Sequence, residues 1–405
     1  MAVLGDYLPE KPKGRTLVVG AGKGAAQLAR AFEQLWSDEC DGVVVTPYGH
    51  ATECKRIRVM QAAHPVSDAA GLKASEALLQ TVSDLTADDL VVALVCGGGS
   101  ALLPAPPPGC TLEDEQALHR ALLVSGAPIS AINAIRKQFS RIKGGRLARA
   151  AAPARVVSLI VSDIPGDDPT LVASGPTVAD NSSREIALDA IAQYKIDLPA
   201  NLRNHLALPE AQSDPPPLAT DPCFANNETH IIASAQQSLQ AAAEHARRQG
   251  VAAHILSDSI EGEAREVARV HAAIARQILR NGQPFSPPLV LLSGGETTVR
   301  VTGSGKGGRN SEFMLSLLMD IAGLDGVTAL AADTDGIDGS EDNAGAFADS
   351  TSRARLGAKG LNPARLLGDN DAWSAFHQLE DLFVTGPTGV NVNDFRALLV
   401  DPREN

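Results

Sequence analysis

Short apolar runs alternate with longer amphipathic stretches along almost the whole chain. Runs such as Leu90–Cys96 and Leu289–Leu292 have the length of buried strands, and stretches such as Ala25–Trp36 and Ile260–Leu279 have helical periodicity. Two consecutive strands can be parallel only when a crossover, usually a helix, separates them. The alternation therefore predicts an α/β protein with mainly parallel sheets.

The composition favours a protein that acts on small molecules. The 405 residues carry a formal net charge of -13, which is unfavourable for binding nucleic acid or an anionic membrane. Five cysteines without a C-x-x-C pair are typical of reduced thiols in a cytosol. No apolar run approaches the roughly 20 residues of a membrane span, and the first residues lack the apolar segment of a signal peptide. We therefore expect a cytoplasmic protein with no nucleic-acid or membrane partner.

Proline-rich breaks interrupt the alternation at two places. Residues 209–222, PEAQSDPPPLATDP, are expected to form a surface excursion within a domain. Residues 281–288, NGQPFSPP, follow a long helical stretch and precede a new strand with glycines behind it. The sequence therefore predicts two domains, residues 1–285 and a smaller α/β domain of residues 286–405.

Glycines and acidic residues directly follow several of the predicted strands. The segments are CGGGSALL (96–103), VSDIPGDDPT (161–170), LSGGETTV (292–299) and DTDGIDG (333–339). Glycines let backbone N–H groups approach phosphate oxygens, and carboxylates at strand ends can hold Mg²⁺. Because the carboxyl ends of parallel strands form the ligand crevice of an open α/β sheet, these segments predict a site for a nucleotide or a phosphate.

The first glycine loop, GAGKGA (20–25), fits the fingerprint of a dinucleotide-binding fold through Gly20, Gly22 and Ala25. That fold also requires an acidic residue at the end of the next strand for the ribose hydroxyls, and here the strand runs into Pro47. Lys23 stands in the middle of the loop, where a cation is suited to a transferring phosphoryl group. The sequence therefore favours phosphate chemistry over a nicotinamide cofactor.

Taken in order, these segments make the chain resemble the glycerate 2-kinases with a MOFRL C-terminal domain, some of which are named hydroxypyruvate reductases. The resemblance is carried by GAGKGA, HPVSDAAG (64–71), CGGGSALL, INAIRKQFSRIKGGRLA (132–148), VSDIPGDDPTLVASGPT (161–177), LSGGETTV, GKGGRNSEF (305–313), DTDGIDGSEDNAGA (333–346) and GPTGVNVND (386–394). It covers nearly the whole chain. It implies ATP-dependent phosphorylation of D-glycerate to 2-phosphoglycerate, in a cleft between a Rossmann-like N-terminal domain and the smaller C-terminal domain.

Two cations are the expected catalytic residues. Lys23 would bind the γ-phosphate or the developing charge, and the resemblance implies that Arg309 reaches the same centre from the other domain. Five cations within residues 136–146 indicate a pocket for the glycerate carboxylate or the ATP phosphates, and Ser100 is expected to hydrogen-bond that carboxylate. The substrate-binding candidates are Gly98, Gly99, Ser100, Arg136 and Lys143, and the nucleotide-binding candidates are Gly294, Gly295, Glu296 and Thr297.

Four aspartates close to predicted strand ends are the candidates for binding Mg²⁺. They are Asp163, Asp168, Asp333 and Asp335. One of them is alternatively the acceptor of the glycerate hydroxyl proton, although phosphoryl transfer depends more on positioning and electrostatics than on a base. His64, which precedes Pro65, is expected to be a structural turn residue.

Two other functions stay open at this point. An NAD(P)H-dependent hydroxypyruvate reductase would oxidise NADH with hydroxypyruvate, whereas a kinase would release ADP with D-glycerate. A non-catalytic nucleotide-binding protein is the third hypothesis, and it does not explain why both cations and several strand-end acids occur together. The sequence also leaves a homodimer open.

Overall fold

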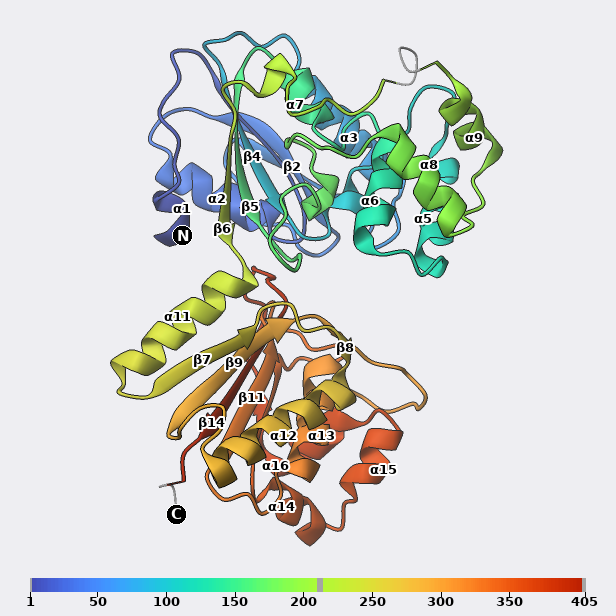
Figure 1. Ribbon diagram of the computed structural model, residues 1–405. Helices are drawn as coiled ribbons and strands as arrows, with labels where there is room; N and C mark the ends of the chain where they lie inside the picture. The colour runs from blue at the N-terminus through green and yellow to red at the C-terminus, as the bar shows by residue number, and fades with distance from the viewer. Residues whose placement is uncertain (1, 210–213, 403–405) are drawn as a thin grey trace. The chain divides into compact units, whose positions relative to one another are not determined.

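The structure, a computed structural model, describes residues 2–209 and 214–402. The chain divides into two compact units, Met1–Ala233 and Ser234–Asn405, and each has its own six-stranded sheet and its own helices (Figure 1). The expected α/β architecture with two sheets is thus confirmed. Residues 210–213, which belong to the predicted surface excursion, lie outside the described residues. Over the described ranges, no helix is both long enough and apolar enough to cross a membrane.

The sheet of the first unit has the strand order β3-β2-β1-β4-β5-β6, and all neighbouring strands are parallel. Its strands are β1 Thr16–Ala21, β2 Asp41–Pro47, β3 Ile57–Ala62, β4 Leu90–Cys96, β5 Arg155–Val161 and β6 Glu228–Ala233. β1 and β4 are buried along their whole length, as expected for continuous runs of Val, Leu and Ala in a covered parallel sheet. Because the strand order reverses between β1 and β4, the loops that leave these two strands lie side by side.

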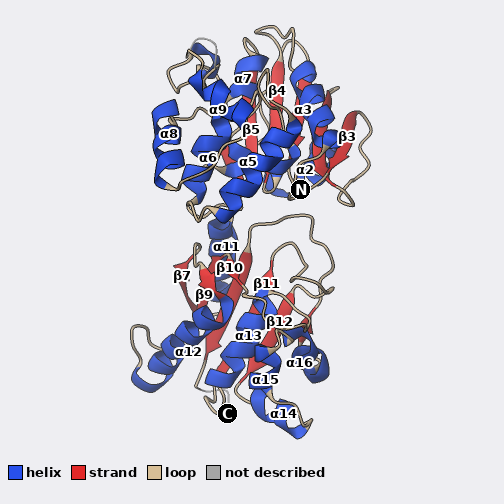
Figure 2. Ribbon diagram, turned by 90° about the vertical axis from the view of Figure 1, so that its right-hand side faces the viewer, coloured by secondary structure: helices blue, strands red, loops and turns tan. Residues whose placement is uncertain are grey.

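Helices cover this sheet, and four of them form a subcluster beside it. The helices are α1 Ala2–Gly5, α2 Ala25–Leu35, α3 Ala69–Thr81, α4 Gly99–Leu102, α5 Leu112–Val124, α6 Ile129–Gln138, α7 Arg146–Ala151, α8 Arg184–Gln193 and α9 Ala200–Ala207, with 3-10 turns η1 Val172–Ser174 and η2 Pro222–Phe224. α5, α6, α8 and α9 lie together in both views (Figures 1 and 2) and share an apolar cluster that includes Leu118, Phe139 and Leu202. This cluster holds α5 and α6 in place at the side of the sheet.

The sheet of the second unit has the order β13-β12-β11-β14-β9-β7. Its strands are β7 Ala252–Ser257, β9 Leu289–Gly295, β11 Val327–Asp333, β12 Gly345–Asp349, β13 Leu382–Phe383 and β14 Asp394–Val400, beside a short parallel pair of β8 Gly262–Glu263 and β10 Thr297–Thr298. β7 and β9 are parallel, whereas β14 is antiparallel to both β11 and β9. The expectation of mainly parallel sheets therefore holds for the first unit and not for the second, because both β12 and β14 run antiparallel to their neighbours.

Helices pack on both faces of the second sheet. They are α11 Ala235–Arg248, α12 Ala264–Asn281, α13 Arg309–Asp320, α14 Ser352–Ala358, α15 Pro363–Gly368 and α16 Ala372–Leu379. The larger apolar cluster joins α12, α13 and α16 to the strands through residues such as Phe313 and Phe376. A smaller cluster around Leu239 joins α11 to the opposite face. The first residue of α13 is Arg309, so this buried helix fixes the position of a predicted catalytic cation.

The second unit begins earlier in the chain than the boundary that we expected between residues 285 and 286. β7 pairs with β9 over Ala252 to Ser257, and α11 packs against the same sheet. Residues 234–285 are therefore part of the second unit by their contacts. The proline-rich segment 281–288 connects the end of α12 with β9 inside that unit.

Candidate active site

The loop between β1 and α2 carries Lys23. Gly22 has a φ of +133°, and a Cβ at this position would lie 2.5 Å from the Cys96 carbonyl oxygen, so the loop requires glycine there. The Lys23 backbone N–H donates to the Gly97 carbonyl at 2.9 Å, which joins this loop to the loop that follows β4. The Lys23 side chain is half-buried, and its Cγ would be 3.4 Å from a Cβ built on Gly98. The two glycine loops thus form one surface.

A pocket of about 190 Å³ opens in the first unit, next to this surface. Its lining residues are His64, Pro65, Ser67, Gly98, Ser100, Ala101, Glu115, Leu118, His119, Arg136, Phe139 and Lys143. Four of the five predicted substrate-binding residues are therefore brought together from two distant segments. The fifth, Gly99, is the first residue of α4, and a Cβ on it would collide with Ala173. His64, which we expected to be a turn residue, also lines the pocket.

The two predicted cations of this pocket differ in how their charge is compensated. The Lys143 ammonium is buried and pairs with Glu115 at 2.8 Å. Arg136 instead donates from Nη2 to His119 Nδ1 at 2.8 Å, and burial lowers the pKa of its guanidinium. The other cations of the 136–146 segment have partners of their own, as Lys137 does with Asp180 at 2.7 Å. Arg136 is therefore the pocket cation with the least compensation from carboxylates.

His119 is neutral in this pocket. Burial, together with the charges of Arg136 and Lys143, lowers the pKa of its imidazole to about 4. A guanidinium can only donate, so His119 Nδ1 accepts and the ring hydrogen is on Nε2. The Nε2 atom is buried and has no hydrogen-bond partner among the described residues. A buried donor without an acceptor costs free energy.

The Ser100 hydroxyl belongs to a chain of three hydrogen-bonding side chains. Ser100 Oγ lies 2.6 Å from Ser174 Oγ, and Ser174 Oγ donates to Asn133 Oδ1 at 2.7 Å. Ser174 and Asn133 are fully buried, and Ser174 has a φ of +60°. Ala173 before it and Gly175 after it also have positive φ values. Such a run is strained for non-glycine residues and is held in place by the surrounding structure.

The two aspartates predicted as metal ligands in this unit have different environments. The Asp163 carboxylate lies against Gly97, so closely that a Cβ on that glycine would collide with it. Asp168 is exposed, and its carboxylate accepts the Thr170 N–H at 2.9 Å within a tight turn. Asp163 is therefore next to the glycine loops, whereas Asp168 is occupied in the local turn.

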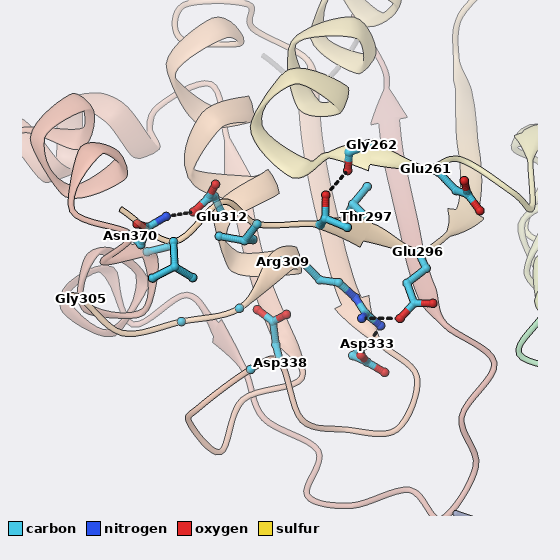
Figure 3. Close-up of a pocket in the computed structure, with 17 residues that line it drawn as sticks. Glu261, Gly262, Glu296, Thr297, Gly305, Arg309, Glu312, Asp333, Asp338 and Asn370 are labelled. Atoms are coloured by element: carbon cyan, nitrogen blue, oxygen red, sulfur yellow. Dashed lines mark hydrogen bonds and ion pairs between the residues drawn. The ribbon is translucent and has the colours of Figure 1, made fainter. Parts of the chain in front are cut away.

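The second unit contains a larger pocket of about 780 Å³ (Figure 3). It is lined by Glu261, Gly262, Glu296, Thr297, Thr298, Val299, Val301, Gly305, Gly307, Gly308, Arg309, Glu312, Asp333, Asp338, Gly339, Asn370 and Ala372. The predicted residues Glu296, Thr297, Arg309 and Asp333 are among them. Gly294 and Gly295 lie at the end of β9 and Asp335 follows β11, and these three are outside the lining. A volume of this size lies in the range of small-molecule and cofactor sites.

Arg309 is held by three carboxylates. Its guanidinium donates to Asp394 at 2.7 Å, to Asp333 at 2.7 Å and to Glu296 at 2.9 Å, and Figure 3 shows it directed toward Glu296 and Asp333. Burial lowers its pKa, but the charges of Asp394 and Asp333 outweigh this effect and raise the pKa above the usual value. Burial also raises the pKa of the Asp333 carboxyl, against the effect of Arg309. The site therefore has more buried negative charge than one arginine compensates.

The start of α13 is fixed by Asp338. Its carboxylate accepts the backbone N–H of Asn310 at 2.8 Å and that of Ser311 at 2.7 Å, and also the Ser311 hydroxyl at 2.6 Å. These contacts satisfy N–H groups that a helix start leaves without a partner. Asp338 thus fixes the position of the glycine loop and of Arg309. Burial raises the pKa of the Asp338 carboxyl.

Comparisons with known proteins cover nearly the whole chain. Residues 4–207 match the family described as "Domain of unknown function (DUF4147)", and residues 289–394 match the MOFRL family. The chain is 38% identical to a D-glycerate 2-kinase of Thermotoga maritima, over 96% of this chain and 91% of the relative. The chain belongs to the glycerate kinase family. This confirms the resemblance described above.

Two further comparisons concern a solved structure and a second name. The crystal structure of a glycerate kinase from Thermotoga maritima superposes with a TM-score of 0.88 at 36% identity, covering 98% of this chain and 93% of that one. A protein of Agrobacterium vitis is 48% identical over 98% of this chain and 89% of the relative, and its name is "Putative hydroxypyruvate reductase". Both names in the family therefore occur among relatives of similar length.

Several residues at the sites of this glycerate kinase family member were not predicted. Glu115 and His119 line the smaller pocket, and Asp338 and Asp394 fix the larger one. Asp394 is the last residue of the GPTGVNVND segment, which the sequence singled out without assigning it a role. Among the described residues, no group of three or more His, Cys, Asp or Glu side chains is arranged to hold a metal ion. The four predicted metal ligands fall two in each unit.

Proposed function

We propose that this protein transfers the γ-phosphoryl group of ATP to D-glycerate and forms 2-phosphoglycerate. The observation that carries the proposal is the 38% identity to a D-glycerate 2-kinase over 96% of the chain, in which both glycine-rich pockets lie. A phosphoryl-transfer enzyme needs a site for the acceptor, a site for the nucleotide and cations for the transferred group. The two pockets and Lys23 meet these needs.

The smaller pocket is the proposed acceptor site. Its volume of about 190 Å³ is suited to a small acid rather than to a nucleotide. Arg136 supplies a positive charge with little compensation, and Lys143 supplies a second cation that is paired with Glu115. Both are suited to a carboxylate. Gly98 and Gly99 belong to the loop that joins this pocket to Lys23.

The larger pocket is the proposed ATP site. Among the described residues that line it, five carry carboxyl groups and one, Arg309, carries a positive charge. A polyphosphate bound there needs a divalent cation to offset repulsion from these carboxylates, which supports the requirement for Mg²⁺. Gly294, Gly295, Glu296 and Thr297 are the proposed nucleotide contacts of the β9–β10 region.

The proposed Mg²⁺ ligands of the second unit are Asp333 and Asp335. Asp333 ends β11 in the pocket, and its Oδ1 accepts the Asp335 N–H at 3.0 Å, so the two residues form one turn. Mg²⁺ in phosphoryl-transfer enzymes is commonly held by one or two carboxylates together with substrate phosphates, and when bound it offsets charge on those phosphates. Asp163 and Asp168 remain the candidates of the first unit.

Lys23 is the proposed catalytic cation. Within the residues that the structure describes, no carboxylate is paired with its ammonium, whereas Arg309 contacts three. An uncompensated charge interacts more strongly with a phosphoryl group in the transition state than a compensated one does. We propose that Arg309 contributes to the same reaction mainly by orienting Glu296 and Asp333.

The first unit is proposed to be Rossmann-like, and the reaction to take place in the interdomain cleft that the resemblance implies. The all-parallel order β3-β2-β1-β4-β5-β6 is that of doubly wound dinucleotide-binding sheets, which supports the first part. We further propose a cytoplasmic enzyme that acts on small molecules without nucleic acid. A homodimer is a proposal that light scattering of the purified protein tests.

The kinase and the reductase are separated by one pair of assays. The proposal predicts ADP release with ATP and D-glycerate, and no oxidation of NADH or NADPH with hydroxypyruvate. The name of the Agrobacterium vitis relative makes the second assay necessary. Against a reductase, β2 ends in Pro47 and lacks the acidic residue that would bind the ribose. Coupling the product to enolase without a mutase tests for 2-phosphoglycerate, and NADH oxidation without ADP release would overturn the proposal.

A further inference from the structure

The hydroxyl hydrogens of the Ser100–Ser174–Asn133 chain can be placed one after another. Asn133 Oδ1 is a carbonyl oxygen and can only accept, so Ser174 must donate its single hydrogen to it. The contact of 2.6 Å between the two serine oxygens then needs the hydrogen of Ser100. Ser100 therefore donates to Ser174, and its Oγ has only lone pairs left for a ligand.

Three other polar groups that line the pocket, on Arg136, His119 and Lys143, are donors. Arg136 is a donor, and the ring hydrogen of His119 is on Nε2 because its Nδ1 accepts from Arg136. The Lys143 ammonium is also a donor and is paired with Glu115. The pocket thus combines these donors with the Ser100 hydroxyl, which accepts, while the Glu115 carboxylate is paired with Lys143 and Ser67 and His64 complete the polar lining.

We propose that Ser100 is a specificity-determining residue that selects acids with a hydroxyl group, rather than a carbonyl group, on the carbon next to the carboxylate. The donors bind the carboxylate, and the neighbouring hydroxyl donates to Ser100 Oγ. A carbonyl oxygen in that place would face the lone pairs of Ser100 and leave it without a donor. The inference rests on the proposed acceptor site, and it replaces the expectation that Ser100 binds the carboxylate.

The same arrangement suits the proposed reaction. A substrate hydroxyl that gives its hydrogen to Ser100 keeps its lone pairs free to attack phosphorus. Ser174 and Asn133 do not touch the substrate in this proposal, so they are positioning residues that fix the direction of the Ser100 hydrogen. Their complete burial prevents water from supplying an alternative acceptor.

D-Lactate and pyruvate test the inference, because they differ only in having a hydroxyl or a carbonyl at this carbon. Their dissociation constants are measured by calorimetry on the full-length protein without ATP. We expect D-lactate to bind the unmodified protein about tenfold more tightly than pyruvate, the equivalent of one hydrogen bond. Ser100→Ala should bring the two constants to within about twofold. Ser174→Ala frees the Ser100 hydrogen to donate, so it should narrow the difference by improving the binding of pyruvate.

A matched control keeps the test specific. Ser158→Ala removes a buried serine whose Oγ lies 2.7 Å from Thr177 Oγ1 outside the pocket, and it should keep the preference for D-lactate. Melting curves of all variants confirm that they are folded. Equal binding of the two acids to the unmodified protein, or an unchanged preference in Ser100→Ala, would overturn the inference. Since the measurement requires no turnover, absence of ADP release would contradict the proposed kinase alone.

Discussion

Arg309 Nε donates to Asp394 Oδ1 over 2.7 Å and thereby joins the first residue of α13 to the first residue of β14. The Asp394 carboxylate is fully buried. It also accepts from Asn310 at 2.8 Å, from the Thr297 N–H at 3.1 Å and from Arg396. One carboxylate therefore connects the start of α13, the start of β10 and the last strand of the chain.

Asp394→Asn should destabilise the second unit. The amide offers one acceptor and presents donors to Arg309 or Arg396, so the fully buried Arg396 loses its carboxylate partner and Arg309 keeps only Asp333 and Glu296. Removing one partner of a buried ion pair costs about 3–5 kcal/mol, and urea unfolding measures this cost. Asp381→Asn is the control, since Asp381 pairs with a more exposed arginine, Arg355, and should cost less than about 1 kcal/mol. Equal costs for the two variants would contradict the role of Asp394.

Lys23→Met should keep the fold and lose catalysis. The methionine stem fills similar space, but the charge at the transferring phosphoryl group is gone. For a preorganised charge this costs roughly 3–4 kcal/mol, so kcat with ATP and D-glycerate should fall about 10²–10³-fold. Lys73→Met, which changes an exposed lysine on α3, should leave kcat unchanged. A folded Lys23→Met protein with near-normal kcat would exclude the catalytic role.

Asp335→Asn should weaken the proposed Mg²⁺ site without unfolding the protein. Loss of one carboxylate should raise the Mg²⁺ concentration for half-maximal ADP release by roughly 10–100-fold. Asp342→Asn provides an exposed control in the same acidic segment and should have little effect. If Asp335→Asn and the unmodified protein need the same Mg²⁺ concentration, Asp335 is not a ligand.

Gly22→Ala should destabilise the first unit more than Gly49→Ala does. Both glycines have a positive φ, at +133° and +81°, but a Cβ on Gly22 would press on the Cys96 carbonyl while Gly49 has open space around it. The difference between the losses of unfolding free energy in the two variants measures the effect of the close approach of the two glycine loops. We expect it to be at least about 2 kcal/mol in urea unfolding.

His271 should make the second unit sensitive to acid. Burial lowers the pKa of its imidazole to about 4, below the unfolded value of 6.5. The unfolded chain therefore binds more protons between these values, and the contribution of His271 to stability, which is complete above pH 6.5, falls as the pH drops toward 4. The slope is at most about 1.4 kcal/mol per pH unit. His271→Gln should have a flatter stability profile over this window, and an equally steep profile would contradict the prediction.

The glycine loops could be predicted from the sequence because each follows a strand with a clear apolar run, as the loops after β4 and β9 do. It also selected Arg136 and Lys143 from a run of five cations, and both line the smaller pocket. Their position depends on α5 and α6, whose packing on α8 and α9 has no local signal. The role of His119 could not be predicted from the sequence either, because it depends on the contact with Arg136 on the neighbouring helix α6.

The last strand, β14, was not predicted from the sequence, although its residue pattern is typical of a strand. β14 alternates buried and half-buried residues from Asp394 to Val400, as a strand in an antiparallel sheet does. It begins with Asp394, and Arg396 comes two residues later; both charged side chains are fully buried. Buried charges of this kind are rare in strands, so a polar start suggests a loop unless the compensating partners are known. The partners come from residues 297–310, far away in sequence.

The pairing of β7 with β9 has a practical consequence for protein fragments. A fragment of residues 286–405, which contains the whole MOFRL match, would lack both β7 and α11. Its β9 would then present an unpaired edge of N–H and C=O groups, next to an apolar face that Leu239 no longer covers. Such edges recruit strands from other chains. A fragment that starts at Ser234 keeps the natural edge strand, so it should be obtained as a soluble species where the shorter one aggregates.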